Sequence, residues 1–425
     1  MSYLSEKYAA HNEIPVCDKT TTGKRVINRM LLGTWLGVAE ESGKFLHVVT
    51  AGPDGWVRKA DVTDARHLKV FYIDVGQGDA ALIEIGDKRM IIDGGPNTHL
   101  RNYLSGWQYS YILSSNKKIH IDHVFVTHFD TDHYAGLTNI INDERFTFGK
   151  IWHNGIARFS GKNSRPEYYD EDLGQTIILN KEKFLITTFD NLTDLSNLKS
   201  SGGLQPAFLK FTEALEKAHS QGRLGGIGKL TSTNGKWMEE NINGLPFRIE
   251  ILGPVTSQLE GSVYFKWFDD SSHTRNGHSL VLKLIYGKTS LLFGGDLNEL
   301  SETHLLKHYG KQNPFLADVA KSCHHGSSEF SVDFLRQVRP YATVISSGDN
   351  ENYSHPRADA IGSAGKYSRG DKPKVYSTEL ARSINSAGKI LYGMINLRSD
   401  GKKIYMAQLK EKRSGANIWD SYEIK

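Results

Sequence analysis

Short apolar runs separated by polar turns fill the first part of the chain. Between residues 20 and 66 these runs are KRVINRM, TWLGVAEES, FLHVVTA and GWVRKADV, and Gly, Ser and Pro lie in the turns between them. Runs of this length, rich in β-branched and aromatic residues, are typical of strands, and strands this short favour a small closed sheet. We therefore predict an all-β unit over residues 1–66.

From Leu68 onward the apolar runs are longer and helical spacing appears between them. The runs LKVFYIDVG, AALIEIG and KRMIIDGG end at glycine, and apolar residues recur at three- and four-residue steps in PAFLKFTEALEKAHSQ (206–221). Such runs predict buried strands, and such steps predict an amphipathic helix. The further strands and helices predicted towards the C-terminus are SLVLKLIYG, TSLLFGGD, LSETHLLKHYG, DVAKSCHH, SVDFLRQV, YATVISSG and the hairpin ILYGMINLRSDGKKIYMAQLK.

The order of these elements predicts the architecture of residues 67–425. Antiparallel strands are followed by alternating helices and strands, and this pattern occurs twice. Two packed sheets with helices outside satisfy it, which is an α/β (α+β) arrangement. Residues 144–262 are the least regular part, and we predict a variable insertion there, with the glycine-rich segment 222–228 as a mobile flap.

Composition narrows the class of protein. Of 425 residues, 39% are hydrophobic and 24% charged, which excludes a mostly disordered chain. The net charge of +4 is too small to require a nucleic-acid partner. Two cysteines cannot form a disulfide framework, the N-terminus has no apolar signal core, and no apolar stretch could span a bilayer. We expect a cytoplasmic protein without membrane insertion.

The densest group of candidate metal ligands follows the strand HIDHVFVTH. His128, Asp130, Asp132 and His133 lie within six residues. In an extended loop alternate side chains share a face, so the first three can point together, and His133 can join them where the chain turns into a helix. Imidazole and carboxylate groups suit zinc, manganese or iron, and so many charges at one strand end are costly without a cation between them.

Three further polar groups also follow apolar strands. Asp296 ends SLLFGGD, His324 and His325 end DVAKSCHH, and His355 follows TVISSG. A lone histidine or turn aspartate is ordinary, but groups at the ends of several strands are presented together by a rigid sheet. Their joint occurrence predicts a site that holds two metal ions.

Taken in order, these motifs resemble a known family. The series DVGQGDA, IIDGG, THFDTDH, ILGP, NGHSLVL, LLFGGD, HHGS and SHP is similar to the metallo-β-lactamase fold, and more narrowly to the soluble hydrolase domain attached to the DNA-uptake channel protein ComEC. The resemblance runs from about Leu68 to about Leu397. It implies a four-layer αββα sandwich with two divalent ions, zinc or manganese, at one edge.

The resemblance also implies roles for single residues. His128 and Asp130 would bind the first metal, Asp132 and His133 the second, and Asp296 would bridge both. Either His324 or His325 would add a ligand to the second metal, and the sequence does not decide between them. His278 is a candidate for the remaining position, although the ComEC-like pattern has an asparagine, here Asn276.

Other residues would support these ligands. Asp93 would accept a hydrogen bond from a ligand imidazole and orient it. His355 would donate a hydrogen bond to a non-bridging phosphate oxygen, and Ser327 would do so more weakly. Asp74 and Asp79 are interpreted as loop-fixing residues, and Cys323 as a core residue without a catalytic role.

A two-metal centre of this kind predicts hydrolysis of a phosphodiester by a hydroxide held between the ions. The catalytic residues would be Asp132, Asp296 and His355, and the substrate DNA or, second, RNA. The alternatives are a phosphodiesterase for small-molecule or choline-phosphate substrates and a non-catalytic metal-binding or assembly protein.

Two features concern binding partners. A basic track for nucleic acid is predicted from scattered clusters with neighbouring aromatic residues, which are Lys117–Lys118, Lys162, Arg165, residues 372–374, residues 410–413, Tyr168 and Tyr169. Gly55-Trp56-Val57 resembles the closing strand of a bacterial SH3-like module, which implies a protein partner or self-association through residues 1–66.

Overall fold

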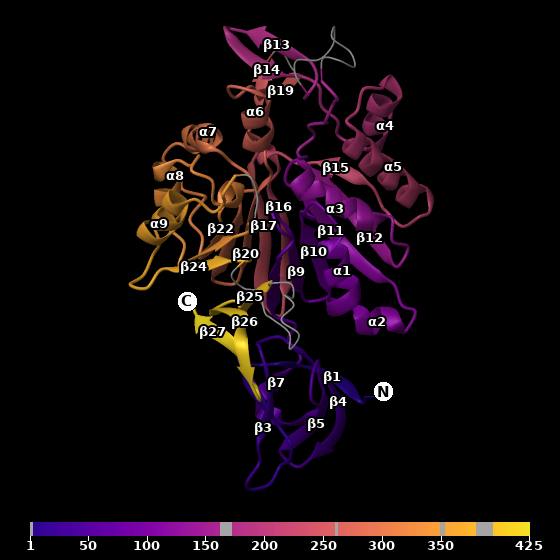
Figure 1. Ribbon diagram of the computed structural model, residues 1–425, viewed down its shortest axis with the longest axis vertical. Helices are drawn as coiled ribbons and strands as arrows, with labels where there is room; N and C mark the ends of the chain where they lie inside the picture. The colour runs from indigo at the N-terminus through magenta and orange to yellow at the C-terminus, as the bar shows by residue number, and fades with distance from the viewer. Residues whose placement is uncertain (1–2, 162–171, 260–261, 349–352, 380–393) are drawn as a thin grey trace.

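A computed structural model describes residues 3–161, 172–259, 262–348, 353–379 and 394–425. Two large sheets pack face to face at its centre, helices cover their outer faces, and a separate all-β unit lies at one end (Figure 1). Among the described residues, none of the helices combines the length and the apolar character needed to cross a membrane.

The N-terminal unit is all-β, as predicted. Its strands pair in the order β3-β2-β6-β5-β4-β1-β7 around a small core that includes Val16, Leu36 and Val48. The strands are β1 (Ser5–Ala9), β2 (Ile14–Cys17), β3 (Val26–Met30), β4 (Trp35–Ser42), β5 (Phe45–Val49), β6 (Gly55–Arg58) and β7 (Val62–Thr63). The likeness to an SH3 module stays a prediction.

The first large sheet has nine strands in the order β15-β12-β11-β10-β9-β8-β25-β26-β27. The strands β10, β11, β12 and β15 run parallel, and the other pairs are antiparallel. Their bounds are β8 (Leu68–Ile73), β9 (Ala81–Ile85), β10 (Lys88–Ile92), β11 (Ile119–Val126), β12 (Phe146–His153), β15 (Ile227–Lys229), β25 (Met394–Ser399), β26 (Ile404–Ser414) and β27 (Asn417–Glu423).

The second large sheet has seven strands in the order β16-β17-β20-β21-β22-β23-β24, with β21 to β24 parallel. Their bounds are β16 (Gly235–Ile242), β17 (Leu245–Gly253), β20 (Val281–Tyr286), β21 (Thr289–Phe293), β22 (Val319–Lys321), β23 (Ala342–Ile345) and β24 (Lys374–Ser377). A small sheet beyond them contains β13 (Thr176–Leu179), β14 (Glu182–Leu185), β18 (Ser257–Leu259) and β19 (Ser262–Lys266).

The helices form the outer layers (Figure 1). On the side of the nine-stranded sheet lie α1 (His99–Tyr103), α2 (Ser110–Ser114), α3 (Thr131–Ile141), α4 (Leu192–Ser201) and α5 (Pro206–Ser220). On the side of the seven-stranded sheet lie α6 (Ser271–Gly277), α7 (Glu299–Tyr309), α8 (Val332–Val338) and α9 (Ala358–Lys366). Short turns are η1 (Lys59–Asp61), η2 (Leu104–Gln108), η3 (Ser232–Asn234) and η4 (Cys323–Gly326). The predicted four-layer αββα sandwich is confirmed.

The strand β8 shows why these runs are apolar on both faces. Val70 and Tyr72 belong to the core between the two sheets, whereas Phe71 and Ile73 belong to the core beneath the helices. Successive side chains of a strand point to opposite faces, so a strand covered on both sides needs apolar residues at every position. The continuous hydrophobic runs follow from this burial.

The segment 144–262, predicted as an insertion, supplies strands to both large sheets as well as α4 and α5. The glycine-rich segment 222–228 is not a flap: it leads into the edge strand β15, and Leu224 forms a bridge to Phe148. Gly225 packs on the carbonyl of Gly149, where a larger side chain would collide. The glycines here allow close approach of two backbones.

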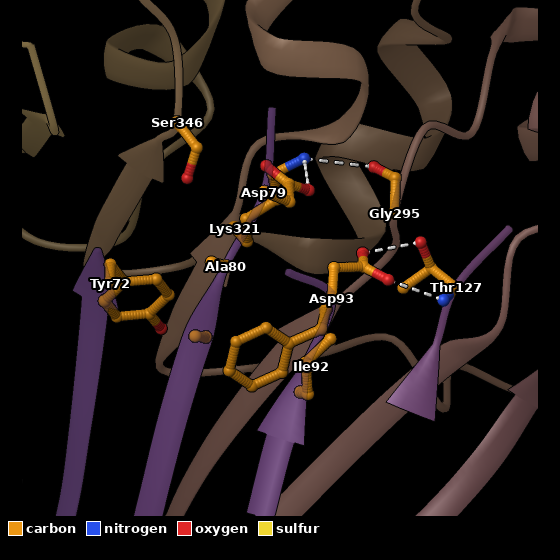
Figure 2. A pocket seen from close by; sticks show the side chains of 11 residues that line it. Tyr72, Asp79, Ala80, Ile92, Asp93, Thr127, Gly295, Lys321 and Ser346 are labelled. Atoms are coloured by element: carbon orange, nitrogen blue, oxygen red, sulfur yellow. Dashed lines mark hydrogen bonds and ion pairs between the residues drawn. The ribbon is translucent and has the colours of Figure 1, made fainter. Parts of the chain in front are cut away.

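The topology brings polar groups to one edge of the sandwich. The chain leaves β10, β11, β21, β22 and β23 at this edge, and β9 begins there because it runs antiparallel to β10. Figure 2 shows the result, with Asp79, Asp93, Thr127, Gly295, Lys321 and Ser346 around one small cavity.

Candidate metal centre

Four buried or half-buried donor groups converge at this edge. The Nε2 atom of His325 lies 3.0 Å from Asp296 Oδ2, 3.3 Å from His133 Nε2 and 3.4 Å from Asp132 Oδ2. The His133 Nε2 atom lies 3.2 Å from Asp296 Oδ2. Donors bonded to one tetrahedral zinc ion at about 2.0 Å stand about 3.3 Å apart. The spacing of these atoms therefore fits one cation at their centre.

The local backbone explains how two neighbouring histidines diverge. The strand β22 ends at Lys321, and the chain then turns through left-handed conformations at His324 (φ 47°) and His325 (φ 53°). This turn places His325 among the four donors. His324 lies beside them, its ring 6.2 Å from that of His325. The structure thus brings His325 rather than His324 into the group.

Groups behind the histidines hold their rings. Asp93 accepts hydrogen bonds from the Thr127 backbone N–H and hydroxyl, both at 2.7 Å, and its Oδ2 lies 2.9 Å from His133 Nδ1. The Nδ1 atom of His325 lies 3.0 Å from the Ser346 carbonyl oxygen. Both imidazoles are therefore held through Nδ1, which directs Nε2 towards the shared centre.

Ser279 contacts three further candidate residues through atoms other than their proposed donor atoms: its hydroxyl lies 3.3 Å from His128 Nδ1 and donates to the Asn276 backbone carbonyl oxygen at 2.8 Å. The Ser279 hydroxyl also accepts from the backbone N–H of Asp296 at 3.1 Å. Among the described residues, His128 Nε2, Asn276 Oδ1 and Asp296 Oδ1 are buried without a hydrogen-bond partner. Buried polar atoms are rarely left unpaired, so each of these three atoms is a candidate ligand of a second cation.

Asp130 differs from the other ligand candidates. Its Oδ1 pairs with both Arg158 and Arg275, while Oδ2 lies 3.7 Å from His128 Nε2. Burial opposes ionisation, but His128 and the two guanidinium groups hold the pKa of Asp130 far below its usual value. Arg158 also pairs with Asp172 at 2.6 Å. The Oδ2 atom of Asp130 is therefore the one that approaches His128.

His278 is not brought into the group. Its Nε2 atom lies 2.7 Å from the Lys266 carbonyl oxygen, and its ring packs against Phe265 and Phe268. Burial lowers its pKa to about 3, so it is neutral. The residue two positions earlier, Asn276, lies in the last turn of α6 and is buried.

The remaining predicted residues lie at the rim. His355 lies with its ring 5.6 Å from His324 and 6.3 Å from His325, and its Nδ1 is 3.4 Å from Gln77 Nε2. His324 Nδ1 is buried without a hydrogen-bond partner. Ser327 accepts from the Glu329 backbone N–H at 3.2 Å, so it caps a turn.

Sequence analysis missed two kinds of residue at the site. One is the arginine pair Arg158 and Arg275. The other is Lys321, a buried ammonium that pairs with Asp79 and donates to the Gly295 carbonyl oxygen at 3.2 Å. A charged residue within the apolar strand DVAK was the available signal, because a buried lysine is rare unless it is paired.

The carboxylates among the four donors carry more negative charge than the surrounding groups offset, and this is visible in the pKa values of the two histidines. Burial disfavours both imidazolium ions, yet Asp296, helped by Asp93 at His133 and by Asp79 at His325, raises the pKa of both histidines well above the usual value. Positive charge on the imidazoles would thus offset the carboxylates while no metal is bound. Cation binding to imidazole and carboxylate releases such protons.

The described basic clusters lie away from these donors. Lys117 and Lys118 precede β11, whereas the donors follow it, so the whole strand separates them. Residues 372–374 likewise precede or begin β24, and residues 410–413 lie on β26, which extends towards the N-terminal unit (Figure 1). Lys162, Arg165, Tyr168 and Tyr169 lie outside the described residues.

Comparison with known proteins adds a family assignment. Residues 73–347 match the Metallo-beta-lactamase superfamily. ComE operon protein 3 of Bacillus subtilis (strain 168) is 33% identical over 89 residues, which make up 21% of this chain and 11% of that protein. Competence protein ComA of Neisseria gonorrhoeae is 39% identical over 82 residues, or 19% and 12%. Each match spans about a tenth of the relative's length.

Solved structures with a similar arrangement are remote in sequence. The metallo-beta-lactamase fold protein YhfI from Bacillus subtilis is 9% identical with a TM-score of 0.38, covering 77% of this chain and 100% of that one. The metallo hydrolase Igni18 from Ignicoccus hospitalis is 14% identical with a TM-score of 0.35, covering 76% and 98%. Values this low say nothing about the substrate of this chain.

Proposed function

Because the chain belongs to the metallo-beta-lactamase superfamily, we propose that it is a metal-dependent phosphodiester hydrolase whose substrate is DNA or, second, RNA. The observation behind the proposal is the spacing of four donors at the sheet edge. His325 Nε2 lies 3.0 to 3.4 Å from donor atoms of Asp296, His133 and Asp132, and His133 Nε2 lies 3.2 Å from Asp296 Oδ2. Asp132 is 30% exposed, so this centre opens to solvent and can meet a substrate.

The proposed ligands divide into two positions. His133, His325, Asp132 and Asp296 would hold one cation, and His128, Asp130 Oδ2, Asn276 Oδ1 and Asp296 Oδ1 would hold the other. Zinc or manganese suits both donor sets. Bound there, a divalent cation polarises a phosphoryl oxygen and makes water a nucleophile at neutral pH.

The chain's own residues would bind and orient the phosphodiester. His324 and His355 stand at the rim of the donor group, where each can donate a hydrogen bond to a phosphate oxygen. Arg158 and Arg275 lie behind Asp130, where they pair with Asp130 and Asp172 and offset the charge of both carboxylates. An anionic diester fits a centre with this balance of charge. Two competence proteins resemble part of this chain, and the ComEC-like motifs of the sequence favour a polynucleotide substrate.

The test is cleavage of single- and double-stranded DNA and of RNA by the purified protein with manganese or zinc. We expect cleavage by the wild type and none by Asp132→Ala or His133→Ala. His120→Ala is the matched control, because His120 is exposed near the opposite end of β11. Equal cleavage by the wild type and the two ligand variants would refute the proposal.

Two outcomes would support the alternatives. Hydrolysis of small phosphodiesters or choline-phosphate compounds without cleavage of polynucleotides would identify a phosphodiesterase of narrower scope. Less than one equivalent of metal after reconstitution would identify a non-catalytic protein. We also propose that residues 1–66 form a separate module, as their own core suggests.

A further inference from the structure

Lys321 is a buried cation inside the proposed metal centre, and none of the roles assigned so far uses it. Its side chain is 4% exposed, its ammonium pairs with Asp79 Oδ2, and it lies 3.6 Å from Asp296 Oδ1. Figure 2 shows the side chain reaching from the end of β22 towards Asp79 and the Gly295 carbonyl. It therefore joins a proposed ligand to the loop that precedes β9.

Asp79 lies on the opposite side of the histidines from the cation position. Its carboxylate faces the Nδ1 atoms, at 3.4 Å from His325 and 3.9 Å from His133. Asp296 faces the Nε2 atoms of the same two rings. One cation cannot bond to both edges of an imidazole, so Asp79 is not a ligand of a cation held at Nε2. Its partner is Lys321.

The described residues leave only a small cavity beside this pair. The cavity between Asp79, Asp93 and Lys321 measures about 10 Å³, which is the room of a single water molecule. The Lys321 ammonium, paired with Asp79, supplies the positive charge at this position. The same loop also braces the ligand segment, because the Asp79 backbone N–H donates to the Asp132 carbonyl oxygen at 3.2 Å.

We propose that Lys321 is a resident cation that holds Asp79 and Asp296 together before metal binds and sets how strongly the centre attracts divalent ions. A buried carboxylate without a counter-charge is costly, so the ammonium stabilises the metal-free site. The same positive charge repels an incoming cation, so it weakens metal binding. Lys321 is thus a positioning residue, and this inference rests on the proposed metal site.

Removing the charge separates these two effects. Lys321→Met keeps the length and apolar stem of the side chain but leaves Asp79 and Asp296 without the ammonium. In the metal-free protein we expect the melting temperature to fall by about 5 °C or more. Affinity for manganese or zinc should rise by at least about tenfold, because one repelling charge is gone. The measurements are thermal unfolding with chelator and metal titration by calorimetry.

A double-mutant cycle and a surface control complete the experiment. Asp79→Asn should weaken metal binding, and Asp79→Asn combined with Lys321→Met should restore affinity to within a few-fold of the wild type. Lys403→Met removes an exposed partner of Glu423 and should change neither quantity. These results would support the proposal.

Other results would overturn it. If metal-free Lys321→Met melts like Lys403→Met, or if its metal affinity is unchanged or lower, Lys321 is not the cation that we infer. Failure of every variant and of the wild type to bind metal would instead refute the proposed function. The melting of the metal-free variants would still decide the role of Lys321.

Discussion

Two clusters of buried charge lie against the nine-stranded sheet, and they differ in how well they are satisfied. In the first, Glu84 accepts hydrogen bonds from Tyr109 at 2.6 Å and Gln108 at 3.4 Å and pairs with Lys69 at 2.6 Å. Neither Glu84 oxygen lacks a partner. In the second, the proposed metal centre, His128 Nε2, Asn276 Oδ1 and Asp296 Oδ1 have no hydrogen-bond partner within the described part of the chain.

The difference separates a structural cluster from a functional one. Buried polar groups that are fully paired stabilise one arrangement of the core. Unpaired buried polar groups destabilise the folded state, so their presence calls for an explanation such as a bound ion. At the sheet edge we propose metal binding as the reason, since all three atoms are electron-pair donors that suit a metal. Asp296 Oδ1 lies 3.6 Å from the Lys321 ammonium, which is an ion-pair contact and not a hydrogen bond. Charge and burial alone would not distinguish the two clusters.

The largest expected effect is at the centre itself. Loss of a group behind a ligand lowers metal affinity or activity about 10–100-fold, and loss of the ligand should exceed this. We expect His325→Ala to lower DNA cleavage by more than about 1,000-fold. His324→Ala should cost only about tenfold, the loss of one hydrogen bond to a charged group. Cleavage rates and bound metal measure both. Equal losses would contradict the placement of His325 among the donors.

The structural cluster should respond in stability instead. Glu84→Ala leaves Lys69 buried without its carboxylate, and we expect the free energy of unfolding to fall by about 3 kcal/mol. Urea unfolding measures this loss, and cleavage per folded molecule should stay unchanged. Glu423→Ala, which breaks an exposed pair with Lys403, should cost less than about 1 kcal/mol. A loss of cleavage in folded Glu84→Ala would contradict the separation of a structural cluster from a functional one.

Asp93 lies between these extremes, because it is fully paired and yet touches a proposed ligand. Asp93→Asn keeps the shape of the side chain but weakens its hold on His133 Nδ1. We expect metal affinity to fall about 10–100-fold, measured by titration against a competing chelator. Glu84→Gln is the matched amide substitution and should leave metal affinity unchanged. An unaffected Asp93→Asn would mean that Thr127 alone orients the ligand loop.

The smallest effects are opposite trends of stability with pH in the metal-free protein. Lys69 and Tyr109 overcome burial and lower the pKa of Glu84 from 4.5 to about 2, so its contribution is complete above 4.5 and is lost as pH falls towards 2. The pKa values of His133 and His325 are raised, so their contribution is complete below 6.5 and is lost as pH rises through the raised values.

Urea unfolding with chelator at several pH values distinguishes the two trends. Glu84→Gln should reduce the loss below pH 4.5, and His325→Ala should reduce the loss above pH 6.5. Saturating metal should remove the second trend only. A loss on the alkaline side that persists with metal would contradict the assignment of these histidines as ligands.

Much of the fold and half of the site followed from the sequence. Continuous apolar runs such as 70–73 are required of strands buried on both faces, so the packed sheets could be predicted. His128, Asp130, Asp132 and His133 could be grouped because they lie next to one another at a strand end. Such features depend on the spacing of neighbouring residues, which the sequence specifies directly.

Tertiary structure alone decided which distant residues meet. The left-handed turn after Lys321 selected His325 over His324, and packing after α6 placed His278 against Phe265 and Phe268, away from the donors. Arg158, Asp79 and Lys321 joined the site through crossovers between strands far apart in the chain. Side-chain direction at the end of an element depends on backbone angles and packing, which residue order does not specify.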